Sequence, residues 1–268
     1  VQTCALPISL KLSTHPVRIM LECVKHGIPV ALSGAPMAGS TAPLTMAGAL
    51  AQTHAEQLAG ITLCQLAHPG AKLLYGGIPG RADLRTMGYC GGAVECGIMN
   101  AAIHQLAHHV GVPNYNSSGL SDSKIPDAQA GWEKGMSTLL TAMGGSNYVH
   151  HAAGMLESMI GIAYEQYVID DEIIGMARRV LRGIEVDKDH LALDVIEEVG
   201  PGGEFITSDH TFDHMHSEYF PGNGVTDRND RATWTQEGEL DAWLRARAMV
   251  KARLEQPEKS WIPEDVDD

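Results

Sequence analysis

Residues 28–32 form a short apolar run that stops in a loop of small residues, and a long helix-forming segment follows. The loop is built almost entirely of Gly, Ala, Ser, Thr and Pro, and residues 43–66 carry few charges. This order predicts a buried strand whose carboxyl end leads through the loop into a helix. In parallel α/β folds that end of a strand carries the chemistry, and small residues let the backbone approach a ligand closely. Plain packing of a helix on a sheet would produce the same pattern.

The same order of apolar run, loop and amphipathic segment recurs along the chain. Several such units in series predict an α/β fold with a parallel sheet. We expect strands at residues 28–32, 72–75, 112–115 and 147–150, with a possible fifth at 204–207. We expect helices at residues 15–26, 43–66, 95–110, 127–143, 157–167, 170–183, 188–199 and 238–255.

Several segments, in a fixed order over most of the chain, match one family of enzymes. The segments are Gly39–Thr45 with Ala55–Ile61, Leu74–Gly76, Ser121–Lys124 with Pro126–Gly131, Val168–Ile173, and Glu198–Gly203 followed by His210 and Thr211. With these segments the chain resembles the trimethylamine:corrinoid methyltransferases, whose relatives include enzymes that demethylate glycine betaine. The similarity is spread over many short segments and does not rest on a single motif.

The resemblance implies a TIM (β/α)8-type barrel of which this chain holds the C-terminal part. A complete barrel has eight strands, and the sequence predicts four or five. We therefore expect residues 1–268 to belong to one barrel domain, with a C-terminal helix and tail over residues 238–268. Residues 1–9 fit neither the family nor the periodic pattern that follows them, and we expect them not to be native sequence.

The resemblance also implies the reaction, in which a methyl group moves from an amine nitrogen to the Co(I) of a corrinoid carried by a separate protein. The expected partners are therefore the cognate corrinoid protein and a methylated amine. Some members of the family use pyrrolysine to activate a tertiary amine, and residues 104–124 hold only ordinary residues. A quaternary ammonium needs no such activation because it leaves as a neutral amine. The expected substrate is therefore a betaine such as glycine betaine.

A fixed cation is bound best by aromatic faces with carboxylates nearby. We expect Tyr75, Tyr115 and His151, which lie at predicted strand ends, to bind the substrate, and Tyr148 is a further candidate. Packing inside a barrel would explain tyrosines at the same positions. Glu95 is expected as a catalytic carboxylate that balances the substrate charge, although it would also suit the positive end of its helix.

The segment that contains Asp122, Ser123 and Lys124 offers hydroxyls, backbone amides and an ammonium between a predicted strand and a helix. We expect it to bind the carboxylate of a betaine. A helix N-cap at Ser123 or Asp127 would account for the same residues. His210 lies in a segment that matches the family, and we expect it to be catalytic.

The histidines and cysteines do not follow the spacing of a structural metal site. His210, His214 and His216 could be interpreted as a metal site. A quaternary amine, however, offers no lone pair or proton on which a metal could act, and we expect no metal cofactor. The cysteines are odd in number and irregularly spaced, which favours reduced thiols and a cytoplasmic location. They are Cys4, Cys23, Cys64, Cys90 and Cys96.

The net charge of -14 argues against nonspecific nucleic-acid binding, which requires clustered Lys and Arg, and it suits a cationic substrate. No segment has the run of about 18 apolar residues that a membrane span requires. Two other functions remain open, namely a catalytically silent barrel fragment that binds an amine or docks the corrinoid protein, and a metal-dependent barrel lyase. Either a monomer or a homo-oligomer is compatible with the sequence.

Overall fold

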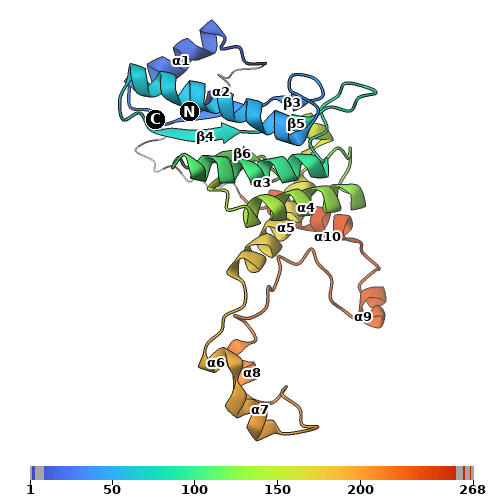
Figure 1. Ribbon diagram of the computed structural model, residues 1–268. Helices are drawn as coiled ribbons and strands as arrows, with labels where there is room; N and C mark the ends of the chain where they lie inside the picture. The colour runs from blue at the N-terminus through green and yellow to red at the C-terminus, as the bar shows by residue number, and fades with distance from the viewer. Residues whose placement is uncertain (1, 4–8, 258–261, 263–265, 267–268) are drawn as a thin grey trace.

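The computed structural model describes residues 2–3, 9–257, 262 and 266, and its main layer consists of parallel strands laid side by side (Figure 1). Helices follow the strands in the expected alternation. The strands are β1 (Gln2–Thr3), β2 (Val30–Gly34), β4 (Leu73–Gly77), β6 (Tyr115–Ser117) and β7 (Tyr148–His150). The helices beside them are α1 (Thr14–Lys25), α2 (Met46–Ala67), α3 (Val94–His109), α4 (Ala128–Met143) and α5 (Tyr164–Arg182).

All of these strands run parallel in the spatial order β1, β2, β4, β6, β7. Strands β2 and β4 pair from Val30 opposite Leu73 to Gly34 opposite Gly77. A bridge between Tyr75 and Asn114 joins β4 to β6, and β6 pairs with β7. Because the strands are parallel, their carboxyl ends meet at one edge of the sheet, where the loops that follow them gather.

One face of the sheet forms the core against the helices. Leu32 of β2 packs with Met20 of α1 and Cys64 of α2. Tyr75, its neighbour in register on β4, is fully buried and packs with Ile103 of α3. Successive side chains of a strand point to opposite faces, so the residues between these core positions face away from the helices.

The α/β class is confirmed, and β2, β4 and β7 lie within two residues of the expected strands, whereas β6 begins at Tyr115, the last residue of the expected strand. Within the described residues β7 pairs with β6 alone, so no barrel closes in this part of the chain. Two short strands, β3 (Met37–Ala38) and β5 (Gly80–Arg81), pair beyond the carboxyl ends of β2 and β4. No described helix combines the length and the apolar character that crossing a membrane requires.

The prediction of a helix over residues 157–167 was wrong. The structure has β8 (Met155–Leu156), the 3-10 turn η1 (Glu157–Met159), β9 (Gly161–Ile162) and then α5, which replaces the two helices expected before residue 183. Glu157, Ser158 and Met159 all have positive φ angles, a conformation that no right-handed helix accommodates. The backbone N–H of Glu157 donates to the carbonyl of Ser123 at 2.8 Å, so contacts to a distant loop override the local helical pattern.

Residues 204–207 do not form the predicted fifth strand. They lie in turns that precede α8 (Asp209–His214), next to glycines with positive φ at 200 and 202, and no strand of the described chain lies beside them to pair with. The helix expected over residues 188–199 is broken at Ala192, which has a φ of 47°. It forms two short helices, α6 (Lys188–Leu191) and α7 (Leu193–Val199).

The C-terminal helix is confirmed, with a later start than expected. Helix α10 (Ala242–Leu254) begins after Asp241, whose side chain accepts a hydrogen bond from the N–H of Leu244. This is an N-cap, and α10 packs against α5. A further short helix, α9 (Arg231–Gln236), lies between α8 and α10.

Residues 184–216, with α6, α7 and α8, extend away from the sheet as an arm (Figure 1). None of these three helices contains a buried side chain. Large apolar residues of the arm lie in solvent, among them Ile184, Val186, Leu193, Ile206 and Phe212. The arm therefore has no apolar core of its own in the described structure.

A buried ion pair connects the helices to the loops at the carboxyl edge of the sheet. Lys134 of α4 and Asp170 of α5 lie 3.0 Å apart, and their side chains are 0% and 1% exposed. The Lys134 ammonium also donates to the carbonyls of Gly119 and Met155, while Asp170 accepts from the N–H of Gly154. Burial lowers the pKa of Lys134, and the Asp170 charge opposes that shift. The pair thus anchors the loops that follow β6 and β7.

Replacing Lys134 with Met should destabilise the fold by about 3–5 kcal/mol, because it leaves the Asp170 carboxylate buried without its counter-charge. The free energy of unfolding from urea titrations measures this effect. Lys25→Ala on α1 is the control, since that side chain lies in solvent and should leave the unfolding midpoint unchanged. A Lys134→Met midpoint equal to that of the control would show that the pair does not hold the loops.

Candidate functional site

The loops that follow β4, β6 and β7 contact one another at the carboxyl edge of the sheet. The N–H of Gly91 donates to the Ser158 hydroxyl at 3.1 Å, and the N–H of Gly92 donates to the Asp122 carboxylate at 3.2 Å. Gly119 has a φ of +71°, and a Cβ there would lie 2.8 Å from the carbonyl of Ala152, so only glycine fits at this crossing. Segments 30 to 70 residues apart in sequence therefore form one surface.

Four rings gather beside β6 and β7, three of them on the strand face that points away from the helices and one, His151, directly after β7. We call Tyr115, Tyr148, His150 and His151 the aromatic cluster. The Tyr115 and Tyr148 rings stack with centroids 5.7 Å apart, and those of His150 and His151 are 3.5 Å apart. The register explains the grouping, because Tyr115 is paired with Tyr148 and Ser117 with His150. Side chains at paired positions share one face of the sheet.

Hydrogen bonds hold the histidines of the cluster in place. The Tyr115 hydroxyl lies 2.7 Å from Nδ1 of His150, and the Ser117 hydroxyl lies 2.9 Å from Nδ1 of His151. His151 has a φ of 62°, a strained conformation for a residue other than glycine and one often found at functional sites.

The environment keeps both imidazoles of the cluster neutral near pH 7. Burial lowers the pKa of His150, and burial together with the neighbouring His150 lowers the pKa of His151 to about 4. Tyr148 is 53% exposed whereas Tyr115 beneath it is 1% exposed, so the cluster opens to solvent at Tyr148. The result is a partly open group of uncharged aromatic faces.

Of the residues expected to bind substrate, Tyr115 and His151 belong to this cluster and Tyr75 does not. Tyr75 is fully buried on the opposite, helix-covered face, where its hydroxyl lies 3.0 Å from Nδ1 of His54. Burial raises the pKa of Tyr75 far above its usual value. These contacts are those of a packing residue.

Asp122, Ser123 and Lys124 lie in the loop after β6, where they hold loops together. Asp122 accepts hydrogen bonds from Gly92 and from the Ser158 hydroxyl, and Ser123 is buried. The exposed Lys124 ammonium donates to the carbonyl of Asp122 at 2.8 Å. The helix cap expected in this segment is present, because the side chain of Asp127 accepts from the N–H of Ala130.

Glu95 lies in the first turn of α3 and pairs with Arg81 at 3.2 Å. The two charges line a cavity of about 430 Å³, together with Leu44, Met46 and Met99. Met46 and Glu95 place the cavity at the first turns of α2 and α3, beside β3 and β5. Glu95 is thus paired with Arg81 and does not contact a member of the aromatic cluster.

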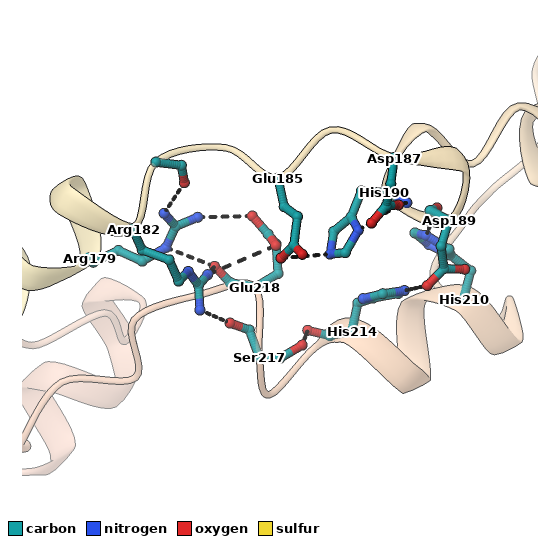
Figure 2. A network of polar contacts seen from close by, with 11 residues as sticks. Arg179, Arg182, Glu185, Asp187, Asp189, His190, His210, His214, Ser217 and Glu218 are labelled. Carbon is teal, nitrogen blue, oxygen red and sulfur yellow. Dashed lines mark hydrogen bonds and ion pairs between the residues drawn. The ribbon is translucent and has the colours of Figure 1, made fainter.

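His210 lies on α8 in the arm, far from the strand ends (Figure 1). Its Nε2 is 3.2 Å from the carbonyl oxygen of Asp189, and its ring is 4.4 Å from that of His214 (Figure 2). The two expected catalytic residues, Glu95 and His210, therefore lie in different parts of the structure and neither joins the aromatic cluster.

Sequence reasoning did not assign a role to Ser117, Ser158, Lys134 or Asp170. Ser117 was missed because the predicted strand ended at residue 115, whereas β6 continues to Ser117 and places it on the same face as Tyr115. The Lys134 and Asp170 pair gives no signal in the sequence, since charged residues on helices are usually exposed. In the described part of the chain, one group of side chains has the spacing of metal ligands, namely Glu185, Asp187 and His190 in the arm.

Four of the five cysteines lie in the described residues, and all four have free thiols: Cys23, Cys64, Cys90 and Cys96. Cys4 and most of residues 1–9 are outside the described residues, so the predictions made for them stay untested. Burial raises the pKa of Cys64 to about 11 and that of Cys96 to about 12, which makes these thiols unreactive.

Comparisons with known proteins agree with the resemblance in the sequence. The family model described as trimethylamine methyltransferase (MTTB) matches residues 9–268. The chain is 36% identical, over 96% of its length, to the glycine betaine methyltransferase of Desulfitobacterium hafniense (strain Y51), of which it covers 53%. It is 36% identical to the trimethylamine methyltransferase MttB of D. hafniense (strain DSM 10664 / DCB-2) and 35% identical to that of Methanosarcina barkeri (strain Fusaro / DSM 804), in each case over 96% of its own length and 51% of the relative's.

The chain spans about half the length of the curated relatives that it matches. The match to the family model nevertheless covers nearly all of the chain, including every strand and loop described above except β1. The chain belongs to the trimethylamine methyltransferase (MTTB) family.

Proposed function

We propose that this protein transfers a methyl group from a quaternary amine, such as glycine betaine, to the Co(I) of a corrinoid protein. The observation that carries the proposal is the aromatic cluster, which extends from Tyr115 and Tyr148, the first residues of β6 and β7, to His150 and His151 at the carboxyl end of β7. The family membership and the similarity to a glycine betaine methyltransferase support it.

The cluster suits a fixed positive charge for two reasons. An accessible aromatic face attracts a cation with about 0.5–2 kcal/mol, and in the cluster the exposed Tyr148 ring offers such a face next to His150 and His151 while the buried Tyr115 supports it from behind. Neutral imidazoles add apolar surface without the repulsion that an imidazolium would exert on a bound ammonium. The net charge of -14 further favours a cationic ligand over an anionic one.

The residues of the site are suited to binding and orientation. A quaternary ammonium departs as a neutral amine, so the reaction requires no proton from the protein. The corrinoid, when its carrier protein docks, supplies the nucleophilic Co(I) that accepts the methyl group. The protein has to hold the trimethylammonium group with one methyl directed outward, and the solvent-exposed side of the cluster, at Tyr148, leaves room for a large partner.

We also propose that β2, β4, β6 and β7 are consecutive strands of a TIM barrel whose other strands lie outside residues 1–268. Four parallel strands adjacent in chain order, each followed by a helix, support this, as does the partial coverage of the relatives. Four free thiols support a cytoplasmic location.

A methyl-transfer assay tests the proposed reaction. Reduced cob(I)alamin carrier is mixed with the protein and, separately, with glycine betaine, carnitine, proline betaine or trimethylamine, and methylcobalamin is followed by its absorbance. Methylation from a quaternary amine supports the proposal. Silence with all four amines in a protein that binds glycine betaine would instead favour the catalytically silent binding fragment.

Tyr148→Ala should weaken the binding of glycine betaine about 2- to 30-fold, because one aromatic face of the cluster is lost. Isothermal titration calorimetry measures the change. Trp132→Ala on α4 is the matched control, since Trp132 is also an exposed aromatic but lies outside the cluster, and it should leave the affinity unchanged. Equal effects of the two substitutions would contradict the placement of the site.

His151 should remain neutral until the pH falls to about 4, and NMR titration of its imidazole measures the midpoint. Since an unfolded histidine titrates near pH 6.5, the contribution of neutral His151 to stability is complete above that pH and is lost as the pH falls toward 4. Binding of a quaternary amine should therefore weaken over the lower part of this range. A midpoint near 6.5 would show that the imidazole carries a charge close to the proposed cation site.

A further inference from the structure

The arm formed by residues 184–216 lacks an apolar core but contains a dense network of polar contacts (Figure 2). Segments of this size rarely fold on apolar burial alone, and disulfides or metal ions commonly stabilise them. The arm contains no cysteine. What it does contain is a cluster of imidazoles and carboxylates.

His190 of α6 is at the centre of this cluster. Its Nδ1 lies 2.9 Å from Oδ1 of Asp187, and its Nε2 lies 3.5 Å from Oε2 of Glu185. One ligand atom from each of these three residues lies within 4.8 Å of the others. The His190 side chain is 22% exposed, so it is better shielded from solvent than the two carboxylates around it.

Helix α8 brings further imidazoles to the same place. The ring of His214 is 5.2 Å from that of His190, and its Nε2 lies 3.2 Å from Oδ2 of Asp189. The ring of His210 lies 4.4 Å from that of His214, at a tilt of 41°, and its Nε2 contacts the carbonyl oxygen of Asp189. The polar cluster therefore connects α6 to α8, although these helices are about 20 residues apart along the chain.

We propose that Glu185, Asp187 and His190 bind a divalent transition-metal ion such as Zn²⁺, with His214 placed to supply a fourth ligand. Zn²⁺ binds imidazole nitrogen and carboxylate oxygen at about 2.0–2.2 Å, which places neighbouring ligand atoms about 3.4 Å apart in a tetrahedral site. With one ligand atom taken from each residue, the three atoms lie within 4.8 Å of one another, and the solvent-exposed side chains of Glu185 and Asp187 can rotate to close the remaining distance. An imidazole ligand favours Zn²⁺ over Ca²⁺ or Mg²⁺, which prefer oxygen ligands.

The site is structural and lies apart from the aromatic cluster, so it is independent of the proposed methyl transfer. The ion would tie the segment at residues 185–190 to α8 and thereby substitute for the missing apolar core of the arm. An ion that binds only the folded state raises the free energy of unfolding. The increase grows with the logarithm of the ratio of the ion concentration to its dissociation constant.

Titration calorimetry with ZnCl₂ on the chelator-treated full chain tests the inference. We expect one Zn²⁺ per chain at the tightest site, at least tenfold weaker binding in His190→Ala, and a similar loss in the double variant Glu185→Gln with Asp187→Asn. His109→Ala and His216→Ala are the controls, because these exposed histidines lie outside the cluster and should leave the affinity unchanged. Far-UV circular dichroism verifies that each variant is folded.

Substitution with Co²⁺ provides a readout that does not depend on affinity. Ligation by nitrogen and oxygen in a low-symmetry site should give visible d–d absorption in the parent chain, and His190→Ala should remove it. Zn²⁺ binding that is equally tight in the parent, in His190→Ala and in the control variants would overturn the proposal. A parent chain that binds no Zn²⁺ would overturn it as well.

Discussion

The buried pair of Lys134 and Asp170 links the helix layer to the loops from which the site is built. Both side chains are shielded from water, and each is satisfied by several partners, including the carbonyls of Gly119 and Met155 and the N–H of Gly154. A charge in this position is costly unless all of its partners are present. The geometry of the loops after β6 and β7 is therefore coupled to the packing of α4 against α5.

Parallel strand pairing supplies the other half of the site. It places Tyr115 opposite Tyr148 and Ser117 opposite His150, so that polar and aromatic side chains from segments more than 30 residues apart share one face. Hydrogen bonds among the loops that follow β4, β6 and β7 then join these loops at the carboxyl edge of the sheet. Burial holds the histidines neutral, and neutrality makes the cluster compatible with a quaternary ammonium. Fold, electrostatics and the proposed chemistry thus depend on the same contacts.

The sequence predicted the parts of the structure that local pattern determines. Strands β2, β4 and β7 and helices α2, α3 and α4 lie at the expected positions because Gly and Pro residues mark the ends of their apolar segments, whereas β6 begins three residues later than expected. The pattern failed at residues 157–163 and 204–207, where long-range hydrogen bonds or the absence of a neighbouring strand decide the conformation. The loop held by the Glu157 N–H is such a case, since its partner Ser123 is 34 residues away.

The candidate site was predictable only in part for a similar reason. Tyr115 and His151 were expected because they lie at the ends of predicted strands, and both belong to the aromatic cluster. Tyr75 also ends a predicted strand, but the face on which a side chain lies depends on register, and a displacement of one residue moves it to the core. The contact of Glu95 with Arg81, and that of His210 with Asp189 inside the arm, follow from tertiary packing that residue types alone do not encode.

The central claim is that the aromatic cluster recognises positive charge. Comparing the binding of glycine betaine with that of 3,3-dimethylbutanoate tests it most directly, because the two molecules share a shape and a carboxylate and differ only in whether the branched centre is a cationic nitrogen or a neutral carbon. The account predicts that glycine betaine binds about tenfold more tightly, a difference of about 1.4 kcal/mol. Equal or tighter binding of the neutral isostere would contradict it.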